Sequence, residues 1–371
     1  RRRPPAPAPP AAHGGLVTRT PLDVATEGAS HLADDLGVEV AADYGDARSE
    51  EGALAAGAGL VDRTATGSVL VSGPDTVKFL HSLLSQDVEV LADGEGAHSL
   101  LLQPQGKLDT DLRILRLGAE EIRLDCEVGR GEALAASLRR FKIRIKADVE
   151  DTTGTWGGLS LRGPEVPAVV EAAAGVAVPE APHAHVSWPG TGLRVVAAPW
   201  PDGRPGADVV GPVVELAAAW AALVAAGATP AGLTAYEAAR VAAGVPRQGL
   251  DIDERTIPQE AFLELDAVSF TKGCFLGQEL VCRIDTRGHV NRHLRAFAIE
   301  PAGDDTTPPP GAGIVWGDKE VGTLTTVTTS GAGIRALGYL RREVELPATV
   351  AVRWDGHEVQ AAAAPLPGEG R

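Results

Sequence analysis

The segment 271–293, TKGCFLGQELVCRIDTRGHVNRH, gathers a thiol, amides, carboxylates and several basic side chains into one short stretch. Cys274 follows Lys272 and Gly273, and a positive charge two residues from a sulfur favours the thiolate form. The segment therefore presents a candidate reactive thiol. The alternative is a buried cysteine that packs as a small apolar residue, as most free cysteines do. The spacing alone leaves both interpretations open.

Two aspartates in the segment 108–117, LDTDLRILRL, form a second candidate site. The alternation of apolar and polar residues predicts a strand, which places Asp109 and Asp111 on one face about 7 Å apart. Two carboxylates in this arrangement could bind a heterocycle that carries adjacent N–H donors. A solvated polar face is the simpler interpretation when no other information is used.

The strongest basic cluster of the chain follows the thiol, with arginines at positions 283, 287, 292 and 295. Four charges suit a phosphate or a polyanionic tail better than the backbone of a nucleic acid. A zinc set could be assembled from Cys274, Cys282, His289 and His293. However, the C-x₇-C spacing is not that of a zinc knuckle, so no metal is predicted. Nucleotide-binding glycine motifs and a G-x-S-x-G elbow are missing from the sequence.

The elements that would position these residues follow from periodicity. Helical spacing predicts helices over 75–84 and 131–141, and alternation predicts a hairpin of strands 108–117 and 121–126, followed by a strand over 143–151. Thr234 and Glu237 have the spacing of a capping box at the start of a helix that ends at Gly244. The segment after it, through residue 264, predicts an ordered loop. Short strands separated by turns after residue 295 predict a small β-barrel or sandwich of about 75 residues.

Composition limits the class of protein. The chain has 371 residues, 34 Lys and Arg against 50 Asp and Glu, and a formal net charge of −16. An acidic chain of this kind argues against a mainly electrostatic partner such as nucleic acid or an anionic membrane. The apolar run 212–227 is shorter than the roughly 20 residues that a membrane span needs. Three cysteines make no disulfide framework, which predicts a cytoplasmic protein.

The segment 272–279, KGCFLGQE, continued by Arg283 and Arg287, resembles the signature of the YgfZ family. The YgfZ proteins are folate-binding relatives of the glycine-cleavage T protein (GcvT, aminomethyltransferase), and they are linked to the maintenance of iron–sulfur enzymes. Further similar segments are 44–45, 68–88, 103–112, 236–252, 257–261 and 320–327. The resemblance spans about residues 38–366.

The resemblance implies an α+β fold: a GcvT-like cloverleaf of two N-terminal α+β subdomains with antiparallel sheets and a small C-terminal β-barrel. The expected units are a disordered Pro/Ala-rich tail and lead-in over 1–36, a folate-binding region over 37–290 and the barrel over 291–366. The folate-binding region divides into subdomains of about 37–155 and 156–290. Tetrahydrofolate, or a one-carbon derivative of it, is expected in the central hole.

Site residues also follow from the resemblance. Asp111 falls where the T proteins carry an aspartate pair near the folate, and Asp109 is displaced from that pair. The T proteins have a glutamate that holds the pterin where this chain has Ala242. Cys274 is the expected functional thiol, near the rim of the folate site. The residues expected to bind the folate are Asp111, Asp109, Tyr236, Arg240, Lys272, Gln278, Glu279, Arg283 and Arg287.

Two functions follow. The first is a tetrahydrofolate-binding protein that supports the assembly or repair of iron–sulfur enzymes through Cys274, with iron–sulfur proteins or their assembly factors as partners. The alternative is an aminomethyltransferase or a related folate-dependent demethylase, in which Asp111 positions or deprotonates the amine. The loss of the glutamate at Ala242 removes a carboxylate suited to pterin N–H donors, and it disfavours aminomethyl transfer. A scaffold without a ligand is a third interpretation.

Overall fold

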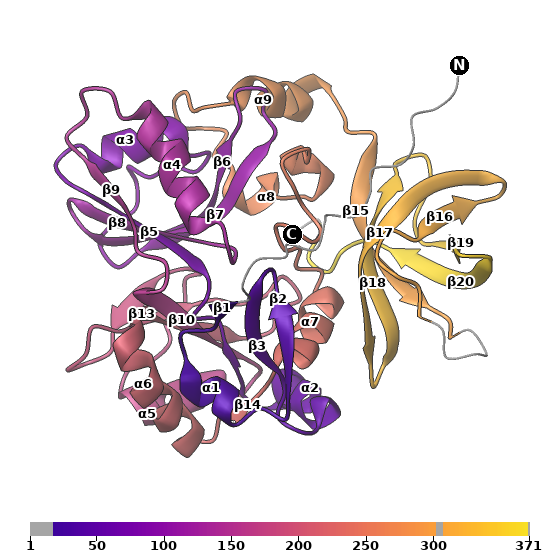
Figure 1. Ribbon diagram of the computed structural model, residues 1–371. Helices are drawn as coiled ribbons and strands as arrows, with labels where there is room; N and C mark the ends of the chain where they lie inside the picture. The colour runs from indigo at the N-terminus through magenta and orange to yellow at the C-terminus, as the bar shows by residue number, and fades with distance from the viewer. Residues whose placement is uncertain (1–17, 302–306, 370–371) are drawn as a thin grey trace.

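The computed structural model describes residues 18–301 and 307–369, which form three antiparallel or mixed sheets and a closed barrel. The two larger sheets and their helices lie on one side, and the barrel lies on the other (Figure 1). The expected α+β cloverleaf with a C-terminal barrel is confirmed. No helix among the described residues is long and apolar enough to cross a membrane.

The first large sheet has the strand order β6-β7-β8-β5-β9. Its strands are β5 Gly67–Ser72, β6 Gly96–Leu102, β7 Leu108–Gly118, β8 Glu121–Cys126 and β9 Asp148–Asp151. The helices α3 Thr76–Leu83 and α4 Gly131–Phe141 pack on one face through buried residues that include Phe79, Leu80 and Leu134. The predicted hairpin and both predicted helices are confirmed. Asp111 and Arg113 alternate with Leu112 and Ile114 of this buried cluster, so they are left on the opposite face of β7.

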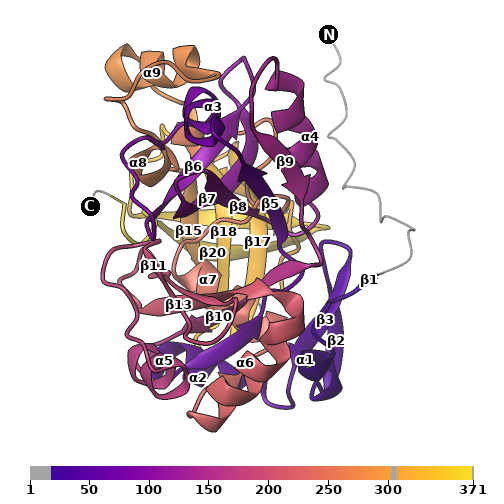
Figure 2. The same ribbon diagram turned by 90° about the vertical axis from the view of Figure 1, so that its left-hand side faces the viewer.

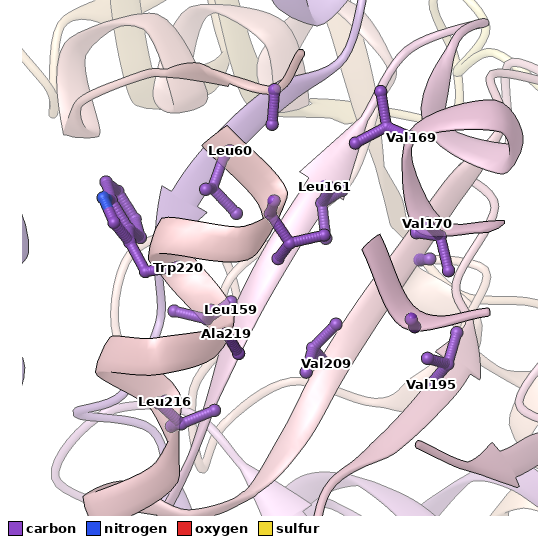
Figure 3. Packing of buried hydrophobic residues seen from close by; sticks show 14 of the residues in the cluster. Leu60, Leu159, Leu161, Val169, Val170, Val195, Val209, Leu216, Ala219 and Trp220 are labelled. Carbon is purple, nitrogen blue, oxygen red and sulfur yellow. The ribbon is translucent and has the colours of Figure 1, made fainter. Parts of the chain in front are cut away.

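The second large sheet has the order β11-β12-β13-β10-β4-β14. It contains β4 Gly59–Asp62, β10 Trp156–Arg162, β11 His185–Ser187, β12 Arg194–Ala197, β13 Gly206–Pro212 and β14 Thr229–Pro230. The helices α5 Val166–Ala174 and α6 Val213–Ala225 bury Val170, Leu216 and Trp220 against Leu161 and Val209 of the sheet (Figure 3). Strand β4, which precedes residue 155, joins this sheet through β10.

The N-terminal part of the described chain is folded. Strands β1 Thr18–Arg19, β2 His31–Asp35 and β3 Val38–Asp43 form a small sheet, and α1 Asp23–Glu27 lies between β1 and β2. Residues 18–36, which the sequence assigned to the tail and lead-in, contain β1, α1 and β2, and β2 hydrogen-bonds to β3 and buries Asp35. The expected tail over 1–17 lies outside the described residues. The helix α2 Ala47–Ala56 follows and contacts α7 Leu233–Ala242.

The C-terminal strands close a six-stranded barrel in the order β15-β18-β17-β16-β19-β20. They are β15 Arg292–Ile299, β16 Gly313–Trp316, β17 Lys319–Ser330, β18 Gly333–Arg341, β19 Ala348–Trp354 and β20 His357–Ala364. Alternate apolar side chains fill its interior, which is the usual arrangement of a small barrel. Between α7 and the barrel lie a 3₁₀ helix Pro258–Glu260, α8 Glu264–Ala267 and α9 Gln278–Arg287. The predicted ordered loop over 245–264 thus contains the first of these short helices and the start of α8.

A buried ion cluster joins these parts. Arg247 contacts Asp35 on β2, Glu127 after β8 and Glu237 on α7 at 2.7 to 2.9 Å. Arg240 on α7 contacts Glu237 and Asp251, and Asp251 accepts from Thr326 of the barrel. Guanidinium groups form such bidentate contacts with carboxylates. The cluster holds α7 in place between the sheets and the barrel.

The same cluster explains why the capping-box prediction is wrong. The helix α7 begins at Leu233 after Gly232, and no side chain caps it. Glu237, which would have closed the box, accepts hydrogen bonds from Arg240 and Arg247 instead. Charge-assisted contacts to two arginines outweigh one local bond to a backbone N–H.

Candidate functional site

A cavity of about 250 Å³ lies between the two large sheets. Strands β7 and β8 supply one wall, β10 and β13 supply the facing wall, and Tyr236 of α7 with residues 246–248 lies at the side toward the barrel. Figure 2 shows the β5–β9 sheet above the β10–β13 sheet, with the barrel strands behind both. We call this space the central cavity. Side chains from distant parts of the sequence meet in it.

Asp111 presents a carboxylate to the central cavity. Its Oδ1 atom lies 2.5 Å from Nε2 of His98 on the neighbouring strand β6. Its backbone N–H donates to Oε1 of Gln248 at 2.9 Å, which fixes the main chain. The second carboxylate oxygen, Oδ2, has no hydrogen-bond partner among residues 18–301 and 307–369. This oxygen is free to accept from a ligand.

Asp109 does not share this face, so the prediction of a carboxylate pair is wrong. Leu101 pairs with Thr110 and Leu102 pairs with Leu108, which leaves Asp109 as a β-bulge without a partner on β6. The bulge turns its side chain toward α4, where Ser137 Oγ lies 3.3 Å from Oδ2. Asp109 lines a different cavity, of about 280 Å³, together with Arg140 and Phe141. Side chains do alternate along β7, but the unpaired residue Asp109 interrupts the alternation, so Asp109 and Asp111 do not share a face.

Most charges in the wall of the central cavity neutralise one another. Arg113 contacts Asp208 at 2.5 Å and Asp125 at 2.9 Å, and Arg162 contacts Asp208 at 3.0 Å. These arginines hold the pKa of Asp208 well below its usual range against the opposing effect of burial. Arg63 and Arg247 have the same effect on the pKa of Glu127. These carboxylates are therefore engaged before any ligand arrives.

Several N–H donors of the wall remain without a partner in the described part of the chain. They are Nε1 of Trp156 and the Nε atoms of Arg113 and Arg162, and all three atoms are buried. The guanidinium of Arg123 lies 3.6 Å from the centre of the Trp156 ring and holds that ring in place. Buried donors without partners are costly, and they commonly indicate a ligand or ordered water.

Tyr236 is placed in the central cavity, as the sequence predicted, but Arg240 is not. The guanidinium of Arg63 lies 5.2 Å from the centre of the Tyr236 ring. The side chain of Arg240 is 0% exposed, and it donates to Glu237, Asp251, Thr326 and the carbonyl of Val245. Because its donors are engaged inside the protein, Arg240 can stabilise the fold and cannot reach a ligand in the cavity.

Lys272 of the KGCFLGQE segment does not line the central cavity and binds backbone carbonyls instead. Its Nζ donates to the carbonyl oxygens of His81, Leu84 and Gln86 at 2.6, 2.8 and 2.9 Å. An ammonium has three donors, so this cluster at the end of α3 uses all of them. Burial lowers the pKa of Lys272 to about 8. The ammonium thus ties the segment to the end of α3.

The other residues expected at the folate lie outside the central cavity. Gln278 accepts from the backbone N–H of Phe275 at 3.2 Å. Cys274, Glu279, Arg283 and Arg287 are exposed on α9 or just before it, and none of them lines the central cavity. The structure therefore gives no support to a thiol at the rim of this cavity. A different cysteine, Cys126, lines it, and burial raises the pKa of its thiol well above the usual value.

The glycines of the KGCFLGQE segment differ in their surroundings. Gly277 precedes α9 with φ +78°, and a Cβ there would lie 2.4 Å from the carbonyl oxygen of Gln103. A Cβ at Gly273 would instead meet no neighbouring atom within 4 Å. Gly277 therefore allows α9 to approach the turn between β6 and β7.

Replacing Gly277 by alanine should lower the free energy of unfolding by about 1–3 kcal/mol, because the new Cβ combines a positive φ with a backbone clash. Replacing Gly273 by alanine is the matched control and should change it by less than about 0.5 kcal/mol. Urea unfolding of both variants is the measurement. Equal effects of the two substitutions would contradict a role for Gly277 in this contact.

Sequence reasoning missed most of the cavity wall: His98, Arg113, Trp156, Arg162, Asp208 and Gln248. His98 could have been found, because alternation along 96–102 and 108–117 allows it to share a face with Asp111. The sequence contains no pattern that links the residues of β10 and β13 to this site, since only the packing of the second sheet brings them close to β7. Among the described residues, no three His, Cys, Asp or Glu side chains are grouped to hold a metal ion.

Residues 23–272 match the model of the GCVT N-terminal domain. The chain belongs to this family. An aminomethyltransferase of Rubrobacter xylanophilus is 29% identical over 361 residues, which cover 95% of this chain and 94% of that protein. An aminomethyltransferase of Bordetella petrii is 28% identical over 358 residues, which cover 95% of this chain and 96% of that protein.

The fold of this chain is also similar to that of a solved structure. The glycine cleavage system aminomethyltransferase T from Bartonella henselae superposes with a TM-score of 0.84 and covers 95% of this chain and 98% of that one. The sequences are 22% identical, so this likeness bears on the fold alone. The expectation of a GcvT-like protein is thus confirmed.

Proposed function

We propose that this chain is a folate-dependent one-carbon transferase of the aminomethyltransferase type, with tetrahydrofolate held in the central cavity. The observation that carries the proposal is the free Oδ2 of Asp111, a residue that lines a cavity whose other carboxylates are engaged by arginines. The names of the similar full-length relatives support the same reaction class. This reverses the order of the two functions that the sequence suggested.

The residues present fit a pterin. A pterin is a flat ring with adjacent N–H donors and ring acceptors. Asp111, which lines the cavity, has one free carboxylate oxygen, and Trp156, which also lines it, has a buried Nε1 without a partner among the described residues. The aromatic rings of Trp156 and Tyr236 line the space. Ala242 is exposed at the end of α7 and does not line the central cavity, so Asp111 is left to hold the N–H donors.

Bound tetrahydrofolate would supply the nitrogen atoms that accept the one-carbon unit. The protein would contribute orientation and a preorganised charge. Asp111 would accept hydrogen bonds or a proton at Oδ2, and a carboxylate within hydrogen-bond reach of an amine can serve as its general base. The arginine pairs keep the wall rigid and prevent its carboxylates from competing for the ligand.

Calorimetric titration with tetrahydrofolate tests binding, and incubation with tetrahydrofolate and an aminomethylated lipoyl carrier protein tests the reaction. We expect saturable binding and formation of methylene-tetrahydrofolate. Binding without this product would reject aminomethyl transfer and retain a folate-binding protein. No binding would overturn the proposal and favour a scaffold.

A second candidate function, support of iron–sulfur enzymes in the manner of the YgfZ family, is favoured by the exposure of Cys274 within KGCFLGQE. An exposed thiol can meet another protein, such as an iron–sulfur enzyme or an assembly factor, without entering the central cavity. The test is rescue of iron–sulfur enzyme activity in a strain that lacks the gene. Cys274→Ala should abolish rescue, and Cys282→Ala, a neighbouring cysteine on α9, is the control. Full rescue by Cys274→Ala would remove the thiol from the mechanism.

The cysteines should also differ in reactivity. Cys274 is exposed, whereas burial and the nearby Asp125 raise the pKa of Cys126 and keep its thiol protonated. Brief treatment of the native chain with iodoacetamide should therefore modify Cys274 at least about tenfold faster than Cys126. Peptide mass spectrometry measures both rates. Labelling in urea, where both thiols are exposed, is the control and should remove the difference.

A further inference from the structure

We propose that His98 is a positioning residue of the central cavity: it holds the carboxylate of Asp111 so that the Oδ2 atom faces the ligand. The inference rests on the proposed function only in naming that ligand as tetrahydrofolate. The pairing of the two side chains can be tested without any ligand.

The register of β6 and β7 places the pair. His98 is the cross-strand partner of Arg113, and Asp111 is two residues from Arg113 on the same face. The imidazole Nε2 approaches Oδ1 to 2.5 Å, and the side chains are 26% and 23% exposed. Gln248 holds the main chain of β7 beside them, since its amide bonds the N–H of Asp111 and the carbonyl of Asp109. The Oδ1 atom of Asp111 is thus bound to His98, and with the main chain also fixed the position of Oδ2 is determined by these two contacts.

The charges around His98 favour a protonated imidazole. Asp111 and Arg113 face it from β7, Asp266 faces it from α8, and His183 faces it from the segment before β11. Burial opposes the proton, but Asp111 and then Asp266 outweigh burial and raise the pKa of His98 above its usual value. His183 is different: burial, Arg113 and His98 lower its pKa to about 3, so it stays neutral. Of these two imidazoles, protonation is therefore favoured at the one that contacts Asp111.

His98 also separates two spaces. It lines the central cavity and a second cavity of about 440 Å³, whose wall includes His183, Trp200, Leu265 and Asp266. Its ring thus forms part of the boundary between them. A smaller or apolar side chain would release Asp111 to turn, whereas glutamine could still donate an N–H to Oδ1.

The first experiment is a double-mutant cycle on the full chain with tetrahydrofolate affinity as the readout. His98→Leu should weaken binding about tenfold, and His98→Gln should recover affinity to within about threefold of the wild type, because a donor to Asp111 returns. In an Asp111→Asn background, His98→Leu should have an effect of less than about twofold, since the partner is gone. Unchanged affinity of His98→Leu, or full additivity of the two substitutions, would overturn the inference.

His31 supplies a matched control. It contacts Asp43 at 2.8 Å on the N-terminal sheet and lines none of the described cavities. His31→Leu removes an imidazole from a carboxylate in the same way as His98→Leu, and it should leave tetrahydrofolate affinity unchanged. A loss equal to that of His98→Leu would show a general effect of charge and contradict a specific role for His98.

The second experiment needs no ligand. Proton NMR titration of the histidine signals of the wild type, with the His98 signal assigned by its disappearance in His98→Gln, should give a pKa above that of an ordinary histidine. Asp111→Asn should lower this pKa, because burial then acts without the carboxylate. An identical His98 pKa in both proteins would overturn the pairing. If tetrahydrofolate failed to bind the wild type, the proposed function would fall, and the titration would still decide whether His98 and Asp111 are coupled.

Discussion

Asp111→Asn should weaken tetrahydrofolate binding by about 10- to 100-fold. The carboxylate is the acceptor with a free oxygen in the central cavity, and a hydrogen bond to a charged group contributes about 1.5–3 kcal/mol. Asparagine keeps the size of the side chain but removes the charge and can present an N–H where the ligand also has one. Isothermal calorimetry at one pH and ionic strength measures the change.

Asp109→Asn is the matched control for this prediction. The two aspartates are two residues apart, yet Asp109 contacts Ser137 on the opposite side of the sheet. Its substitution should change the affinity by less than about twofold. Equal losses in both variants would show that the folate does not occupy the central cavity, and losses confined to Asp109→Asn would move the site to the cavity beside α4.

Arg240→Leu should lower the free energy of unfolding by about 3–5 kcal/mol. The guanidinium is fully buried and contacts Glu237 at 2.5 Å and Asp251 at 2.6 Å. Leucine leaves both carboxylates without this partner, and Asp251 is fully buried. The substitution also removes the bond to Thr326 of the barrel. Urea unfolding monitored by circular dichroism is the measurement.

Arg255→Leu provides the comparison, because Arg255 makes an exposed contact with Asp253 at 2.6 Å. An exposed pair of this kind contributes little, so the free energy of unfolding should change by no more than about 0.5 kcal/mol. If Arg240→Leu were as mild as Arg255→Leu, the buried cluster would not be what joins α7 to the barrel. A fall in folate affinity without a fall in stability would restore Arg240 as a ligand contact.

The sites of the two candidate functions lie in different parts of the molecule. The residues that line the central cavity carry the free carboxylate oxygen and the unpartnered donors, and the proposed folate chemistry is assigned there. The exposed thiol of Cys274 precedes α9 in the chain and does not line that cavity, and its exposure supports a contact with another protein. One chain can therefore be tested for each function with substitutions that leave the other site intact. Asp111→Asn addresses the first, and Cys274→Ala addresses the second.

Strong local patterns were read correctly from the sequence. The hairpin β7–β8, the helices α3 and α4 and the short strands of the barrel each bury a periodic apolar face, and periodicity is a property of the sequence. Local patterns failed where a distant residue intervened. Glu237 accepts a hydrogen bond from Arg247 and does not cap α7. A β-bulge at Asp109 places its side chain on a different face from that of Asp111.

By itself the sequence determined the fold class, through the resemblance, and it pointed to Asp111 and Tyr236, which the structure places in the central cavity. It also placed Cys274 in a chemically dense segment. Only the tertiary structure decided that this segment forms α9 at the surface, with Lys272 bonded to the end of α3. It alone brought His98, Trp156 and Asp208 around Asp111, because the packing of one sheet against another depends on the side chains of both and is not encoded in the spacing of either.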